Sequence, residues 1–448
     1  LGDVYKRQPL QSGLGVTTWY PLLTYPLTDR MRLQVDLANG NLLAEATDLA
    51  IKGIGHDLVV GRVWQSLAAG APNPHGAWDN WALTTGQDVQ LLGAGTSTVT
   101  FVDGSGAQYA FTQQGSTYTS PPGIDATLVK NQDQSFTLTF HATGERLTFA
   151  MPRGTQGAPI PSVTSDTDQD GNAIAFAYNL STFDPGYGQL LSVTDTQGRR
   201  VNLTWTQLHT ELQSLADPTG RTWQYGYGTG SYPDLTSYTD PSNKQTAYGY
   251  DASNNLNQIT DPNGQVTGMV YDAQHRVTSI TFGQGSAVAG TYTFTYNTGN
   301  TVVTDPKSHA TTYSYDSQLR TTKITDALSN SVQYAWTADN HVQQVTDAKN
   351  QVFTYGYNGN NSLTSYQLPT GATTSWAYAD SNHPFYPTGT TDPQGNTTTI
   401  HYTAAGDPDV ITNALPSQNQ TQLFYNANGT VDHVVDARGN TTSMAYDA

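Results

Sequence analysis

Alternating apolar and polar positions along most of the chain predict short β-strands. Tyr248 and Tyr250 stand two apart, as do aromatic residues in several later stretches. A spacing of two places these rings on one face of a strand. A polar turn follows each aromatic pair, and a second apolar segment such as Leu256–Ile259 comes after the turn. Each such stretch therefore predicts a β-hairpin of two short strands.

The second strand of each hairpin departs from this alternation. Its apolar residues, Leu256 and Ile259 in the clearest case, are three apart and not two. A β-bulge in that strand would give this spacing, and so would a strand with both faces covered. The pattern leaves both explanations open.

The hairpins recur with a period of about 21 residues. Asp240 and Asp261 stand 21 apart, as do the Tyr-Asp pairs at 250–251 and 271–272. The residues that mark the repeat are Asp240, Tyr250, Asp251, Asp261, Gly264, Tyr271, Asp272, Asp305, Tyr315, Asp316, Asp326, Asp347, Tyr357, Asp392, Gly395 and Tyr446. In Thr-Asp-Pro-x-Gly turns, Asp can cap its own backbone and Gly accepts positive φ. A fixed period of this length predicts a stacked repeat architecture.

The repeats predict a division of the chain. Residues 161–448 form the repeat array, and residues 31–160 form a β-meander module in which Asn39-Gly40 predicts a tight hairpin between 32–37 and 42–51. Residues 9–30 are a lead-in segment. Residues 1–8, LGDVYKRQ, are expected to be a non-native leader of translated adapter sequence.

Composition supports strands and excludes several functions. Only three Glu occur, and charged residues make up 12% of the chain, which argues against helices. The net charge of −17 opposes binding to nucleic acid; it serves solubility or, alternatively, an acidic interior suited to a cationic cargo. The absence of Cys excludes disulfides and thiolate metal sites. The sequence contains no run of 18 apolar residues, so it predicts no membrane-spanning helix.

Candidate chemistry is sparse. Asp166, Asp168 and Asp170 match the opening of a calcium loop, but Ala177 stands where its bidentate Glu belongs. An ordinary turn at 168–172 is the main interpretation, and a weak calcium site is the alternative. The His residues are scattered, and no nucleophile elbow or phosphate loop occurs. We therefore expect no enzyme activity, no catalytic residues, no cofactor and no metal.

The Tyr-Asp units and their Thr-Asp-Pro-x-Gly turns resemble the YD repeats of Rhs proteins, Tc-toxin C subunits, wall-associated proteins and teneurins. The resemblance covers about residues 163–448. Segments 35–42, 62–66 and 76–78 resemble the module that precedes these repeats. The resemblance implies an all-β fold: a β-meander module followed by a hairpin-repeat sheet that curls into part of a hollow β-shell, or cocoon.

The same resemblance implies a structural function. We expect the encapsulating shell of a bacterial Rhs-type polymorphic toxin used against neighbouring cells, enclosing a C-terminal toxic domain outside these residues. The expected partners are that toxin cargo and a secretion machinery, and the expected location is secreted or on the bacterial cell surface. An extracellular adhesin or carbohydrate-binding surface protein that contacts glycans is the alternative.

Overall fold

The protein is built almost entirely from β-strands, as predicted. The computed structural model describes residues 14–68, 81–115, 117–150, 161–181, 184, 186–206, 211–229, 233–414 and 419–446. Within these residues the helical elements are two 3-10 turns, Ser66–Ala68 and Gly86–Asp88. No helix in these ranges has the length and hydropathy needed to cross a membrane. The predicted leader at residues 1–8 lies outside the described residues.

The N-terminal strands form an antiparallel sheet in the order of the chain. They are β1 (Leu22–Pro26), β2 (Met31–Asp36), β3 (Leu42–Ile51), β4 (Leu58–Gln65) and β5 (Trp81–Leu83). The predicted hairpin is confirmed, because β2 pairs with β3 and Val35 lies opposite Leu42. Gly40 adopts a φ of 83° in the connecting turn, a conformation that Gly takes with little strain. We call this the N-terminal sheet.

The next eight strands close on themselves. They are β6 (Gln90–Leu92), β7 (Thr98–Val102), β8 (Gln108–Gln114), β9 (Thr117–Thr119), β10 (Ala126–Lys130), β11 (Phe136–Phe140), β12 (Arg146–Ala150) and β13 (Ser162–Thr167). Each pairs with the next, and Ser162 of β13 returns to pair with Gln90 of β6. Two backbone hydrogen bonds flank this closing pair, from Leu91 N to Pro161 O at 2.9 Å and from Val163 N to Val89 O at 3.0 Å. We call this closed unit the ring.

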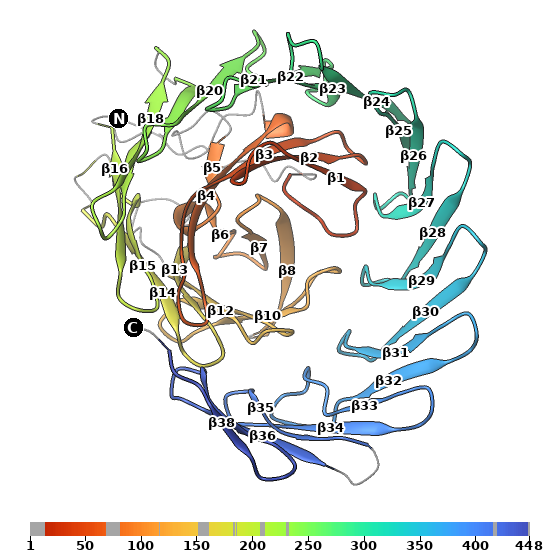
Figure 1. The fold of residues 1–448 in the computed structure, drawn as a ribbon. Helices are drawn as coiled ribbons and strands as arrows, with labels where there is room; N and C mark the ends of the chain where they lie inside the picture. The colour runs from red at the N-terminus through yellow and green to blue at the C-terminus, as the bar shows by residue number, and fades with distance from the viewer. Residues whose placement is uncertain are drawn as a thin grey trace.

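The repeats form one long antiparallel sheet that leaves the ring at β13 and curves around it. Each strand from β14 onward pairs with its neighbours in sequence. Figure 1 shows that this sheet, the wall, encircles the ring and the N-terminal sheet. Its strands are β14 (Ala173–Tyr178), β15 (Leu190–Thr194), β16 (Arg200–Trp205), β17 (Leu212–Ala216), β18 (Thr222–Tyr227), β19 (Leu235–Thr239), β20 (Gln245–Tyr250), β21 (Leu256–Thr260), β22 (Val266–Tyr271), β23 (Val277–Phe282), β24 (Gly290–Asn297), β25 (Asn300–Thr304), β26 (Ala310–Tyr315), β27 (Thr321–Thr325), β28 (Ser331–Trp336), β29 (Val342–Thr346), β30 (Val352–Tyr357), β31 (Leu363–Gln367), β32 (Thr373–Ala377), β33 (Gly389–Thr391), β34 (Thr397–Tyr402), β35 (Pro408–Thr412), β36 (Gln420–Tyr425), β37 (Val431–Val435) and β38 (Thr441–Ser443).

A recurring β-bulge explains the unusual spacing in the second strand of each hairpin. Tyr250 pairs with Leu256, whereas Gly249 pairs with Gln258, so Asn257 is an extra residue in β21. The extra residue turns both Leu256 and Ile259 towards the core, where each is almost fully buried. The same shift recurs where the wall pairs β14 with β15, β22 with β23, β30 with β31 and β36 with β37. Of the two explanations, the bulge is confirmed.

The hydrophobic core lies between the N-terminal sheet, the ring and the first part of the wall. Its fully buried members run from Met31 of β2 to Val303 of β25. The hydrophobic side chains of the wall beyond β25 are partly buried or exposed, and none of those described is a buried member of this core. The wall is therefore packed against the N-terminal modules along its first half, and its later inner face lacks this cover.

Candidate functional site

The predicted Asp residues stabilise the turns between strands. The Oδ1 atom of Asp261 accepts hydrogen bonds from the backbone N–H groups of Asn263 and Gln265, both at 2.8 Å. These bonds satisfy donors that the turn would otherwise leave unpaired. The same pair of bonds forms at Asp240, Asp251, Asp272, Asp305, Asp316, Asp326, Asp347 and Asp392. The turns before and after each aromatic strand therefore both use an Asp side chain to accept hydrogen bonds from the backbone of the turn.

The fourth residue of each turn lies in the left-handed region. Gly264 has a φ of 80° and Gly395 a φ of 85°, as the Thr-Asp-Pro-x-Gly pattern predicts. In other turns a residue with a side chain takes this position, including Ser308 and Ser329, each with a φ of 68°, and Leu319 with a φ of 63°. These turns are strained where the repeat has lost its Gly.

The repeat tyrosines tie each hairpin to the previous one. The hydroxyl groups of Tyr250, Tyr271, Tyr357 and Tyr446 each donate to the backbone carbonyl of the residue 15 positions earlier, at 2.7 to 2.9 Å. Trp336 does the same with its Nε1 atom, which donates to Thr321 O at 2.7 Å. Tyr315 differs, because its hydroxyl faces Asn297 O at 3.4 Å, 18 positions earlier. The 21-residue period did not reveal Trp336, because the period was defined by Tyr-Asp pairs and not by the side-chain group that donates the hydrogen bond.

A buried ion pair of the N-terminal sheet forms hydrogen bonds to two tyrosines of the wall. Arg62 of β4 and Asp48 of β3 are almost completely buried, and Nε of Arg62 lies 2.9 Å from Oδ2 of Asp48. Arg62 also donates to the hydroxyl of Tyr248 at 2.8 Å, and the Tyr225 hydroxyl donates to Asp48 at 2.8 Å. Burial raises the pKa of Tyr225 well above its ordinary value, so its proton stays available for this bond.

Aromatic rings complete this contact. The guanidinium of Arg62 lies 4.8 Å from the ring centres of both Trp81 and Tyr238. The Nε1 atom of Trp81 donates to the hydroxyl of Tyr250 at 2.9 Å. No sequence pattern marked Asp48, and Arg62 stood out only within a short motif. The Gly76–Trp78 part of the same resemblance lies outside the described residues.

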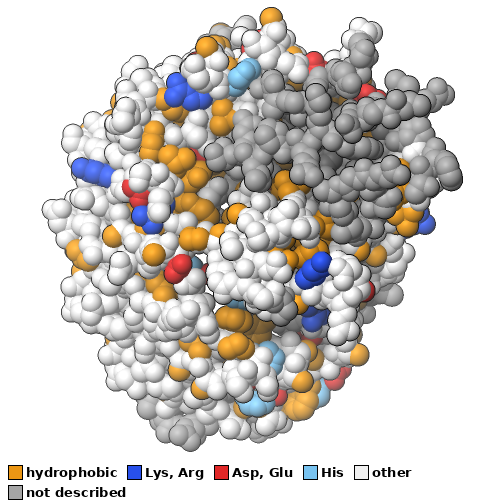
Figure 2. Space-filling view, turned by 180° about the vertical axis from the view of Figure 1, so that it is seen from behind, with side chains coloured by type: hydrophobic (Ala, Val, Ile, Leu, Met, Phe, Trp, Pro, Cys, Tyr) orange, Lys and Arg blue, Asp and Glu red, His pale blue; other side chains and the backbone are white. Residues whose placement is uncertain are grey.

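The inner face of the later wall carries aromatic residues that the N-terminal modules do not cover. Tyr334, Tyr355 and Trp376 hold the position in their units that buried Tyr248 holds in β20, yet each is only partly buried. Period two puts them on the same face as Tyr248, which faces inward towards Arg62. Figure 2 shows the molecule from behind, with hydrophobic side chains gathered near the centre of the view and few charged ones beside them.

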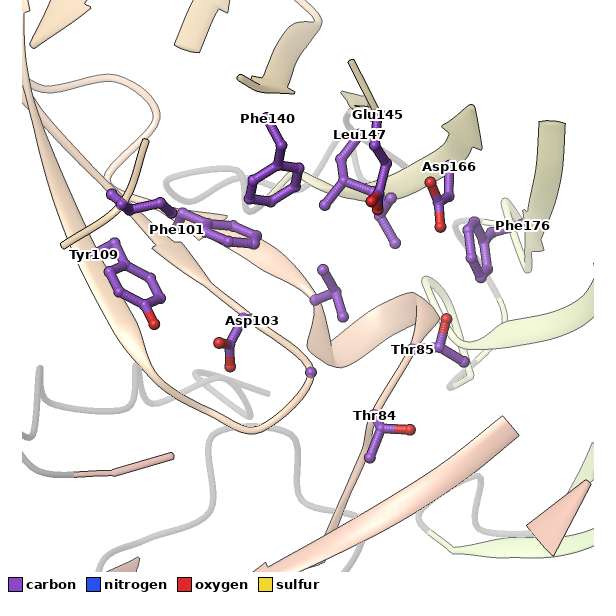
Figure 3. A pocket seen from close by; sticks show the side chains of 14 residues that line it. Thr84, Thr85, Phe101, Asp103, Tyr109, Phe140, Glu145, Leu147, Asp166 and Phe176 are labelled. Atoms are coloured by element: carbon purple, nitrogen blue, oxygen red, sulfur yellow. The ribbon is translucent and has the colours of Figure 1, made fainter. Parts of the chain in front are cut away.

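A cavity of about 330 Å³ is lined by residues of the ring, by Phe176 of β14 and by Thr84 and Thr85 after β5. Phe101, Phe140 and Leu147 line it together with the carboxyl groups of Asp103, Glu145 and Asp166 (Figure 3). Burial and the neighbouring Glu145 raise the pKa of Asp166 to about 6. The lining residues include no Ser, Cys, His or Lys.

The three carboxylates of the alternative calcium site face three different surroundings. Asp166 lies beside Glu145 and 3.7 Å from Nε2 of His56. Asp168 accepts from the backbone of Asp170 and Asn172 within its own turn, as the turn interpretation predicts. Asp170 lies against Asp407 of the wall. In the described part of the chain no group of three His, Asp or Glu side chains is placed to hold a metal ion.

Comparison with known proteins adds two family matches. The family described as RHS Repeat matches residues 234–266 and 258–287, and a domain of unknown function, DUF6531, matches residues 33–111. No curated protein matches the chain in sequence. The repeat matches fall on β19 to β23, and the other match covers most of the N-terminal sheet and the first strands of the ring.

Several solved structures are similar. The crystal structure of TcdB2-TccC3 without its hypervariable C-terminal region has a TM-score of 0.47 and 12% identity, covering 91% of this chain and 27% of that chain. The crystal structure of TcdB2-TccC3 itself gives 0.37 and 11%, with 92% and 24% covered. A Photorhabdus luminescens Tc holotoxin pore with a mutated TccC3 gives 0.30 and 10%, with 93% and 30% covered. The chain thus spans about a quarter to a third of the length of these structures.

The matched residues 234–287 contain the same Asp-capped turns and tyrosine hydrogen bonds that continue along the wall to Tyr446. The structural unit behind the sequence period is therefore the unit of the matched family. The chain therefore contains RHS repeats, matched at residues 234–287.

Proposed function

We propose that this chain forms part of an encapsulating shell that encloses a toxic polypeptide. The observation that carries the proposal is the wall itself: a continuous sheet that curves round the molecule and leaves aromatic residues partly uncovered on its inner face beyond Val303. An apolar inner face of this extent is the kind of surface that covers another polypeptide. The RHS repeat match agrees with this role.

The cargo would be a toxic domain of the same polypeptide, and the complete protein would act outside the cell that makes it, by way of a secretion machinery. The described residues would serve as structure and not as an enzyme. The similarity to Tc-toxin structures named above is the reason for choosing a toxin as the cargo class.

Limited proteolysis of the protein produced from its complete reading frame tests the proposal. A domain inside the shell should resist protease while the wall is intact and become cleavable in an Arg62→Met variant, which weakens the contact between wall and N-terminal sheet. The Arg32→Met variant is the matched control, because Arg32 pairs with Glu45 at the surface. Equal cleavage of the domain in all three proteins would refute enclosure.

The adhesin alternative predicts an exposed strip of aromatic residues that could stack on sugars. In the part of the chain that the structure describes, Phe424 and Tyr446 are the aromatic members of the set of well-exposed large hydrophobic residues. Two separate rings do not form such a strip, and the geometry favours the shell.

A further inference from the structure

The cavity of about 330 Å³ described above has an apolar side and an acidic side. In Figure 3 the aromatic side chains of Phe101 and Tyr109 lie towards one side, and the carboxyl groups of Glu145 and Asp166 lie near each other towards the other. Among the described residues that line the cavity, none is Lys, Arg or His. Its volume falls within the range of small-molecule pockets, roughly 300 to 1,000 Å³. The cavity is therefore large enough for a small ligand.

Contacts between aromatic side chains hold the apolar side in place. The ring centre of Phe101 lies 6.1 Å from that of Tyr109, with planes 24° apart, and 6.3 Å from that of Phe140, with planes 64° apart. Phe101 also contacts the fully buried Phe149, with ring centres 5.9 Å apart. Offset and edge-to-face contacts of this kind favour fixed orientations of the aromatic side chains. The apolar side is therefore preformed and needs no rearrangement to receive a ligand.

One of the three carboxyl groups of the cavity has a structural role in its own turn. Oδ1 of Asp103 accepts hydrogen bonds from the backbone N–H groups of Ser105 and Ala107, at 2.8 and 3.0 Å. The Asp residues of the wall accept backbone hydrogen bonds in the same way. The fold therefore accounts for Asp103, whereas the carboxyl groups of Glu145 and Asp166 remain to be explained.

Glu145 and Asp166 place negative charge beside the cavity without a permanent cation. In the described part of the chain no Lys or Arg forms an ion pair with either of them. Arg146, the next residue after Glu145, donates instead to the carbonyl of Asp168 at 3.0 Å. Nε2 of His56 lies 3.7 Å from Oδ1 of Asp166, and both atoms are buried without a hydrogen-bond partner among the described residues. A buried carboxylate oxygen without a donor costs free energy, which a cationic donor in the cavity would recover.

We propose that this cavity binds a small primary amine that carries an aromatic group. The ammonium group of the ligand would donate hydrogen bonds to the carboxylates of Glu145 and Asp166, and its aromatic group would lie against Phe101 and Phe140. The carboxylates gain the donors that they lack, and apolar surface on both partners leaves water. The proposal concerns a ligand of the ring, and it stands whether or not the wall encloses a cargo.

Carboxylates also surround the approach to the cavity. Glu145 lines a second hollow of about 620 Å³, so the two spaces adjoin at its side chain. Asp170 and Asp407 line this hollow, together with the aromatic side chains of Tyr386 and Tyr402. Negative charge on the walls of a cleft raises the local concentration of cations. The second hollow therefore favours the entry of a positively charged ligand over that of a neutral or negative one.

Calorimetric titration with three matched probes tests the proposal. Phenethylamine carries the ammonium group, phenethyl alcohol has the same aromatic body without charge, and hydrocinnamate carries a negative charge. At pH 8 a primary amine is protonated, and Asp166, whose pKa is raised to about 6, is ionised. The amine should bind at least tenfold more tightly than the alcohol, and hydrocinnamate should not bind. Equal affinities for the amine and the alcohol, or no binding of the amine at millimolar concentration, would overturn the proposal.

Variants show whether the carboxylates of the cavity hold the amine. Glu145→Gln and Asp166→Asn keep the size of each side chain and should each weaken amine binding by about tenfold, without changing the affinity for the alcohol. The matched control is Asp133→Asn, which changes an exposed carboxyl group of the ring that does not line the cavity. This control should bind the amine as the unchanged protein does. Amine binding that survives in both cavity variants, or that falls equally in the control, would reject the site.

A variant that fills the cavity separates the apolar side from the charge. Leu147 lines the cavity and is almost fully buried, so Leu147→Phe should occupy space that the ligand needs. Binding of both the amine and the alcohol should then weaken by at least fivefold, with all three carboxyl groups of the cavity still present. Unchanged amine binding in a folded Leu147→Phe protein would place the amine outside the cavity, and the carboxyl variants decide the question if this variant does not fold.

Discussion

The hydroxyl of Tyr271 donates a hydrogen bond of 2.7 Å to the backbone carbonyl of Leu256, 15 residues earlier in the chain. Leu256 begins the second strand of one hairpin, and Tyr271 ends the first strand of the next. The bond therefore fixes one hairpin to its predecessor at the edge of the bulge. It gives a physical reason for the Tyr in each Tyr-Asp pair, beyond the apolar area of the ring.

Tyr271→Phe should lower the free energy of unfolding by about 1 to 2 kcal/mol, because it leaves a buried carbonyl without its donor. Denaturant unfolding followed by tryptophan fluorescence measures the effect. Tyr334→Phe is the matched control, since the structure gives its hydroxyl no hydrogen-bond partner among the described residues. Equal losses in the two variants would mean that the lost hydroxyl, and not the hydrogen bond to the carbonyl, causes the effect.

Ser329→Gly should stabilise the protein by about 0.5 to 1 kcal/mol. Ser329 is exposed and has a φ of 68°, a conformation that costs residues with a Cβ atom more than it costs Gly. Leu328→Gly in the same turn is the control, because Leu328 is 83% exposed and is not among the residues with positive φ. That change should be neutral or destabilising, and a gain in both variants would contradict the explanation.

Arg62→Met should destabilise the contact between the N-terminal sheet and the wall by about 3 to 5 kcal/mol, because Asp48 would be left buried without its cation. Thermal unfolding checks the size of the loss. Arg32→Met removes the surface pair with Glu45 and should cost about 1 kcal/mol or less. The double variant Asp48→Leu, Arg62→Met should recover much of the lost stability. No recovery would show that packing of the aromatic side chains around Arg62, and not charge, decides the contact.

Acid should weaken the turns of the wall. Hydrogen bonds from the side chains of Asn330, Asn396 and Asn440 lower the pKa values of Asp326, Asp392 and Asp436. A carboxyl with a lowered pKa contributes stability that is present above its ordinary pKa and is lost as pH falls through the lowered value. Melting temperatures measured from pH 5 down to pH 2 should therefore fall.

Changing all three of these Asp residues to Asn should flatten the acid side of the melting-temperature profile, since the amide keeps an acceptor oxygen but cannot titrate. A triple variant with an unchanged acid profile would refute the role of the turn carboxylates.

The repeat unit was predictable because its determinants are local. Asp261 and Gly264 act within one turn, and Tyr250 bonds to a residue only 15 positions away. A fixed period in the sequence therefore reveals both the turn residues and the tyrosines. The bulge at Asn257 was visible as a spacing of three but needed coordinates to be distinguished from a strand with two covered faces.

The contacts between modules were not predictable in this way. The Tyr225 hydroxyl lies 177 positions from Asp48, and Gln169 lies 238 positions from Asp407. No local pattern marks a buried ion pair or a contact between distant turns, because each depends on how far the wall has curved. The same holds for the closure of the ring by Ser162 and Gln90.

The hydrogen bonds to residues 15 positions earlier also set an order of assembly. Each new hairpin finds both its strand partner and its tyrosine acceptor in the hairpin made just before it, so the wall can grow only from an existing end. The N-terminal sheet and the ring leave the ribosome first and supply the template against which β18 to β24 pack. During synthesis from the N- to the C-terminus, the inner modules would therefore fold first, and the hairpins of the wall would then be added around them one after another.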